Sequence, residues 1–91
     1  MTSEEYLYKS IEMILDYIEK NLKNRIILDD ISNEVHISKY HLDRIFHAVL
    51  NKKLIEYARM RKLSSSLKEL LETNLKISDI SREYGFEYEQ S

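Results

Sequence analysis

The residues best suited to do chemistry stand together between Ser38 and His47. Ser38 can cap a helix, because its hydroxyl accepts hydrogen bonds from the free N–H groups of a first turn. Apolar residues then recur at helical spacing, namely Leu42, Ile45, Phe46 and Val49. The other faces of the expected helix carry Lys39, Tyr40, Asp43, Arg44 and His47. Such a front suits a nucleic-acid groove, although an ordinary amphipathic surface helix has the same pattern.

Three residues of this front are candidates for reading bases directly, namely Tyr40, Asp43 and Arg44. Arg44 is the strongest one, since a guanidinium can donate two hydrogen bonds to O6 and N7 of guanine. Its alternative is a salt bridge with Asp43 or Glu56. Asp43 can either accept a hydrogen bond from the N4 amine of cytosine or orient Arg44, and both remain open. Lys39 and Tyr40, at the helix start, can donate to phosphate or contact a thymine methyl group.

Other polar residues are candidates for contacts to the DNA backbone or for flanking positions. They are Ser38, Lys39, His47, Lys52, Arg59 and Arg61. Arg59 and Arg61, together with Lys62, can equally serve only to solvate their own helix. His41 fits a solvent-facing or hinge position as well as it fits a contact.

The charge of the chain is unevenly distributed, although its net value is only −2. Between His36 and Lys62 there are seven Lys and Arg residues and two acidic residues, whereas the remainder has seven basic and fourteen acidic residues. DNA affinity follows the local potential that faces the phosphates rather than the sum over the chain. The segment is therefore predicted to face DNA, with chance clustering in a charged helical protein as the alternative.

Composition excludes several classes of protein. The 91 residues suffice for one domain and contain no Cys, so neither disulfides nor thiolate metal sites are available. The three His are spaced by five and six, and the single Gly provides no phosphate loop, so we expect no enzyme, cofactor or metal. The acidic start does not resemble a signal peptide, and no apolar run approaches the ~20 residues of a membrane span. A cytoplasmic location without membrane contact is expected.

The periodicity predicts an all-α fold of five helices, with the start of a sixth near Tyr88. We expect them at about 4–24, 28–35, 38–50, 54–72 and 77–84, with Asn51 and Gly85 ending two of them in left-handed conformations. The three serines at 64–66 are kept helical, because the apolar period continues through them. The helices at 28–35 and 38–50, separated by a short turn, have the spacing of a helix-turn-helix.

A short motif occurs twice. Residues 30–37 and 79–86 share D-I-S-x-E-apolar-x-apolar, and each copy ends at a turn. Such a duplication predicts two related helix-turn-helix units joined by the helix at 54–72.

These features resemble the DNA-binding domain of AraC/XylS-type transcription regulators, close to the MarA, SoxS and Rob group. The matching residues are Ile31, Glu34-Val35, Ser38 to Phe46, Tyr57, Arg61, Leu63, Leu70-Leu71, Ile77 to Ile80 and Tyr84 to Glu87. The resemblance implies a homeodomain-like three-helix unit (1–51), a linker helix (52–73) and the start of a second helix-turn-helix (74–91). The family's second recognition helix follows the Gly-Phe pair, so the chain is expected to be truncated before it.

The resemblance also implies positions and partners. In that group the helix at 38–50 reads the major groove from positions that match Tyr40, Asp43 and Arg44, but Trp and Gln stand there in place of Tyr40 and Asp43. Double-stranded DNA is the expected partner, and RNA polymerase is a further candidate. Self-association is expected through an exposed C-terminal segment with Ile80, Tyr84 and Phe86. The alternative function is a helical protein–protein module, such as an anti-sigma-like bundle, without DNA binding.

Overall fold

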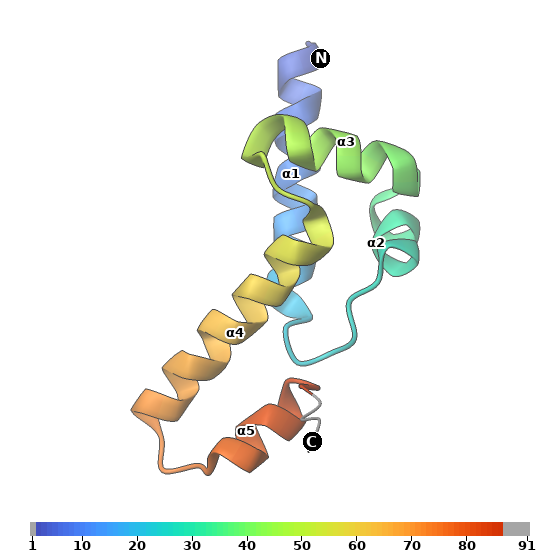
Figure 1. Cartoon of the computed structure of the whole chain (residues 1–91). Helices are drawn as coiled ribbons and strands as arrows, with labels where there is room; N and C mark the ends of the chain where they lie inside the picture. Colours follow the sequence, from blue (N-terminus) through green and yellow to red (C-terminus); the bar gives the residue numbers. More distant parts are fainter. Residues whose placement is uncertain (1, 87–91) are drawn as a thin grey trace.

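The computed structural model describes residues 2–86, which form five α-helices and, within that range, no strand (Figure 1). The helices are α1 (Ser3–Lys20), α2 (Leu28–Val35), α3 (Lys39–Leu50), α4 (Leu54–Glu72) and α5 (Ile77–Glu83). The all-α prediction is confirmed, and the bounds of α2, α4 and α5 agree with expectation to within one residue.

Local hydrogen bonds explain where the helices begin and end. The Ser38 hydroxyl accepts from the His41 N–H at 3.3 Å, so the predicted cap of α3 is present. The first helix ends at Lys20, earlier than the expected 24. The Asn21 amide donates to the Tyr17 carbonyl and the Asn24 amide donates to the Asn21 side chain. Asn side chains that bond locally in this way compete with the helical backbone and end the helix early.

One hydrophobic core joins α1, α2, α3 and the start of α4. Its largest fully buried side chains are Phe46, Ile14, Ile18, Ile31, Leu42 and Leu54. The Phe46 ring packs against Tyr57 of α4 with centroids 5.3 Å apart. Val49, expected in the apolar stripe, is 36% exposed. It stands in the last turn of α3, and its neighbour Leu50 packs against the core there.

The helices in the two copies of the repeated motif end with the same backbone conformation. His36 follows α2 with φ 59°, and Gly85 occupies the matching place after α5 with φ 72°. The next residue then donates its N–H back into the helix, from Ile37 to the Ser32 carbonyl (3.3 Å) and from Phe86 to the Ser81 carbonyl (2.9 Å). Both helix ends therefore form a Schellman-type closure, which needs one left-handed residue.

The long helix α4 leaves the core and carries α5 at its far end (Figure 1). Its serine-rich stretch is helical, as predicted, and Ser66 is buried. The Ser65 and Tyr84 hydroxyls lie 2.9 Å apart. The expectation that Ile80 and Tyr84 are exposed is wrong, since they are 4% and 3% exposed, because α5 packs its inner face against α4. The predicted helix near Tyr88 lies outside the described residues.

Candidate nucleic-acid interface

The outer face of α3 is open to solvent, while its inner face is fully covered. Leu42, Ile45 and Phe46 hold the helix on the core. On the other side, Tyr40 is 85% exposed, and Arg44 and His47 are also exposed. Asp43 is half-buried. The short turn after α2 sets α3 across the other helices, as Figure 1 shows.

The candidate base reader Arg44 is free of the ion pairs that the sequence left open. Within residues 2–86, no salt bridge joins Arg44 to Asp43 or Glu56. Lys39 instead pairs with Asp29 of α2 at 2.9 Å, and this hydrogen bond raises the pKa of Lys39. Because both side chains are largely exposed, the pair is weak and can be exchanged for a phosphate.

His41 faces α1 rather than the outer side of α3. Its ring stacks on Tyr6 with centroids 6.5 Å apart and 26° between the ring planes. This contact ties the first turn of α3 to the N-terminal half of α1. The sequence offered a solvent-facing or hinge position and a DNA contact for His41, and it did not predict this contact with Tyr6.

A shallow hollow of about 400 Å³ runs along the outer face of α3. It is lined by Asp43, Arg44, His47, Ala48 and Lys53. The sequence predicted three of these as site residues but missed Lys53 as a member. Asn51 could have indicated the place of Lys53. It turns the chain in a left-handed conformation and so brings Lys53, the N-cap of α4, back beside α3.

The basic segment divides into residues that face solvent and residues that hold the fold together. Arg61 donates two hydrogen bonds to the Glu19 carboxylate of α1, at 2.9 and 2.6 Å. Lys62 donates to the Asn24 carbonyl at 2.6 Å. Arg59 is exposed, and Lys52 reaches only the Met60 sulfur at 4.0 Å. Arg61 and Lys62 thus fix α4 against α1 and the loop that follows it.

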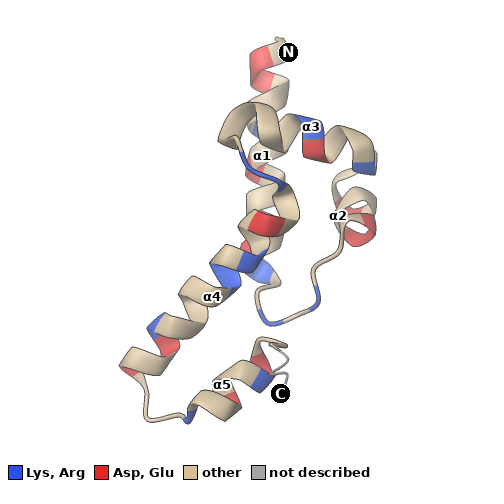
Figure 2. Cartoon of the chain, viewed as in Figure 1, with Lys and Arg blue, Asp and Glu red and all other residues tan. Residues whose placement is uncertain are grey.

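Acidic and basic residues are unevenly distributed over the helices, as Figure 2 shows. Red residues mark α2, which carries Asp29, Asp30 and Glu34 and has no Lys or Arg. Blue residues outnumber red ones over α3, the turn after it and the first half of α4, where the acidic residues are Asp43 and Glu56. A phosphate backbone approaching α3 from its outer side therefore meets mainly positive charge.

The described residues contain neither a cluster of metal-ligating side chains nor a membrane-spanning helix. No three His, Asp or Glu side chains within residues 2–86 gather in a group able to hold a metal ion. Over the same range, no helix has both the length and the apolar composition required to cross a membrane.

Comparison with known proteins shows which family the chain is similar to. Residues 31–91 match a family model described as a helix-turn-helix domain. The chain is 43% identical over 81 residues to the HTH-type transcriptional activator AarP of Providencia stuartii, covering 89% of this chain and 60% of AarP. It is 37% identical over 82 residues to the multiple antibiotic resistance protein MarA of Escherichia coli, covering 90% of this chain and 65% of MarA.

A third relative is the TetD protein of transposon Tn10 from Escherichia coli, which is 35% identical over 89% of this chain and 59% of TetD. The chain thus spans about 60–65% of the length of these relatives. No solved structure shows a significant match. The match to a family of transcription regulators confirms the prediction that the chain is not an enzyme. On this match and this architecture, the chain belongs to the AraC-type helix-turn-helix family of DNA-binding transcription regulators.

Proposed function

We propose that the protein regulates transcription by binding a specific duplex sequence, with α3 (Lys39–Leu50) in the major groove. The observation that carries the proposal is the front of α3, where Arg44 and Tyr40 are exposed and Arg44 has no acidic partner among the described residues. An unpaired guanidinium on a rigid helix can bind guanine without first breaking a salt bridge. This family is not one of protein–protein modules without DNA binding, so that alternative is set aside.

The individual roles follow from exposure and contacts. Tyr40, Asp43 and Arg44 are proposed to contact bases. Ser38, Lys39, His47, Lys52 and Arg59 are proposed to contact the backbone or flank it, and Lys53 joins them because it lines the same hollow as Arg44. Arg61 is set apart from this group, since its bidentate bond to Glu19 supports a role in the fold.

The proposal also divides the chain into two related units and a linker helix. We infer a first helix-turn-helix unit at 1–51, a linker helix at 52–73 and the start of a second unit at 74–91. The shared closure at His36 and Gly85 supports the equivalence of the two units. A DNA target places such a protein in the cytoplasm, where transcription occurs in the organisms of these relatives.

Two further partners are proposed. RNA polymerase is the first, because the relative AarP is named a transcriptional activator. Self-association is the second, now through the exposed side chains Leu67, Leu71 and Ile77 rather than through Ile80 and Tyr84. Sedimentation of the chain alone, compared with its Leu71→Glu variant, measures this association directly.

Salt titration tests the proposed function. Binding to duplex DNA should weaken steeply with added salt, because each neutralised phosphate releases about one counterion. Lys52→Gln should reduce the slope of log K against log salt by about one unit and weaken all sequences alike. Arg61→Gln should leave the slope unchanged in protein that remains folded. A chain whose binding is independent of salt, or that binds no duplex at low salt, does not have this function.

A further inference from the structure

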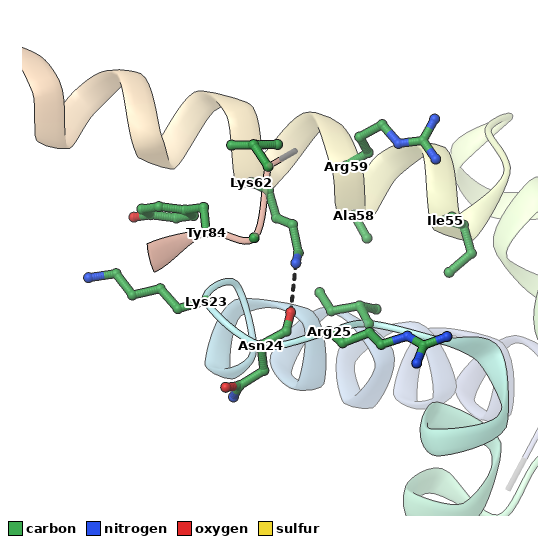
Figure 3. A pocket seen from close by; sticks show the side chains of 11 residues that line it. Lys23, Asn24, Arg25, Ile55, Ala58, Arg59, Lys62 and Tyr84 are labelled. Atoms are coloured by element: carbon green, nitrogen blue, oxygen red, sulfur yellow. Dashed lines mark hydrogen bonds between the residues drawn. The ribbon is translucent and has the colours of Figure 1, made fainter. Parts of the chain in front are cut away.

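A second pocket lies away from the front of α3, between α4, the loop that follows α1 and the end of α5 (Figure 3). Its volume is about 480 Å³, within the usual range for small-molecule sites of roughly 300–1,000 Å³. The walls come from three separate segments of the chain, so an occupant would touch all of them at once. None of its described lining residues belongs to α3, and Arg59 is the one of them that is also among the proposed DNA-backbone contacts.

The polar part of the pocket is cationic. Lys23, Arg25, Arg59 and Lys62 line it, and none of its described lining residues is Asp or Glu. Lys23 is already neutralised, since Glu69 and Glu83 accept from its Nζ at 2.8 and 3.2 Å. Arg25 and Arg59, in contrast, have no ion pair within residues 2–86.

Lys62 is the central cation of the pocket. Its side chain extends from α4 toward the loop, where Nζ donates to the Asn24 carbonyl at 2.6 Å, as the dashed line in Figure 3 shows. Partial burial lowers the pKa of Lys62, and within the described residues no carboxylate compensates its charge. A partly desolvated cation with only a neutral acceptor gains strongly from an added anion.

The rest of the pocket is apolar. Ile26 of the loop, Ile55 and Ala58 of α4 and Phe86 after α5 supply hydrocarbon walls. Inorganic phosphate or a phosphate of duplex DNA has no apolar surface that could pack against these walls. A carboxylate attached to a flat apolar body matches both parts, because its oxygens face the cations while its rings cover the hydrocarbon.

We propose that this pocket binds a small aromatic carboxylate, with Lys62 and Arg25 holding the carboxylate and with Ile55, Ala58 and Phe86 packed against the ring system. The occupant bridges the loop after α1 to α4 and to the end of α5. It therefore stabilises the folded arrangement of these three segments.

Isothermal titration of the 91-residue chain with 2-naphthoate, in the absence of DNA, tests the proposal. The neutral 2-naphthamide has the same shape and should bind at least roughly tenfold more weakly, the factor expected from losing charge-assisted hydrogen bonds. Lys62→Met and Arg25→Gln should each weaken 2-naphthoate by a similar factor. Lys9→Met, which removes an exposed cation of α1 outside the pocket, should have no effect.

Each possible result decides the proposal. Melting curves establish that the variants are folded, and Arg25→Gln, which breaks no ion pair within residues 2–86, keeps the test valid if Lys62→Met is destabilised. Absence of 2-naphthoate binding, equal binding of 2-naphthamide, or equal weakening by Lys9→Met overturns it. The proposal also fails if both pocket variants bind 2-naphthoate normally but lower the salt slope of DNA binding, which assigns these cations to phosphate. The titration contains no DNA, so it does not depend on the function proposed for α3.

Discussion

At the scale of single residues, two left-handed positions with matching places in the repeat are occupied by different amino acids. His36 carries a Cβ at φ 59°, whereas Gly85 lacks one at φ 72°. The left-handed region costs an L side chain about 1 kcal/mol, and Gly avoids this cost. The two positions therefore differ in strain although their hydrogen bonds are alike.

His36→Gly should raise the free energy of unfolding by about 0.5–1 kcal/mol, and Gly85→Ala should lower it by a similar amount. Apart from its chain neighbours, no atom of the described residues lies within 4 Å of a Cβ built on Gly85, so the cost there is that of the backbone. Urea unfolding measures both changes. His36→Ala is the control, because it keeps the Cβ and should gain nothing. An equal gain from His36→Ala would show that loss of the imidazole, rather than backbone strain, is responsible.

The ion pair between Arg61 and Glu19 is a second feature at the scale of single residues. The hydrogen bonds from the Arg61 guanidinium hold the pKa of the Glu19 carboxyl below its ordinary value, against the opposing effect of burial. A carboxyl with a lowered pKa in the folded state adds stability above its unfolded pKa of about 4.3. That contribution is lost as the pH falls from about 4.3 through the lower pKa of the folded state.

Glu19→Gln should therefore destabilise the protein at pH 7 by roughly 0.5 kcal/mol, a value reduced because Glu19 is about half exposed. At a pH below the folded-state pKa of Glu19, where the carboxyl is protonated in both states, the variant and the original chain should be equally stable. Thermal melts across this pH range measure the difference. Glu12→Gln, on the same helix and without an ion pair within residues 2–86, is the matched control. A pH-independent difference for Glu19→Gln contradicts this account.

At the scale of elements, the sequence predicted most of what is local. The apolar period indicated the helices, and Ser38, Asn51 and Gly85 indicated where α3 begins and where α3 and α5 end. The early end of α1 was missed, because the side-chain bonds of Asn21 and Asn24 override a continuing apolar period.

Contacts between distant residues were not predictable from spacing. Arg61 was grouped with possible DNA contacts, yet its partner Glu19 lies 42 positions away in the chain. The burial of Ile80 and Tyr84 likewise depends on how α5 returns against α4. Periodicity specifies the inner face of a helix but not which other element covers it, so the front of α3 was predictable while the second pocket was not.

Packing of α3 on the core positions its front, and Phe46 is the main anchor. Phe46→Ala should lower the free energy of unfolding by roughly 3–5 kcal/mol, because a fully buried ring is removed and a cavity remains. Val49→Ala, in the same helix but exposed, should change it by only about 0.5 kcal/mol. Chemical denaturation compares the two variants. Similar losses for both would mean that the inner face of α3 has been misassigned.

At the scale of the whole molecule, the described chain is elongated, with extents of 47 × 28 × 22 Å. The first unit and α5 lie at opposite ends of α4, and Lys23 joins the ends through its bonds to Glu69 and Glu83 and through the Tyr84 ring 5.4 Å from its Nζ. The exposed front of α3 and the cationic pocket are therefore separate surfaces of one connected scaffold. The net charge of −2 describes neither surface, since acidic residues are concentrated on other elements.

The central claim is that α3 reads bases through Arg44. Selection of bound duplexes from a random pool at low salt tests it most directly, using the original chain, Arg44→Ala and the scaffold control Arg61→Ala. Arg44→Ala should lose preference at one base position, by about 1–3 kcal/mol, and keep its preference elsewhere. Arg61→Ala should keep the original preference at every position. If Arg44→Ala selects the same bases as the original chain with the same discrimination, Arg44 does not read the groove and the central claim is wrong.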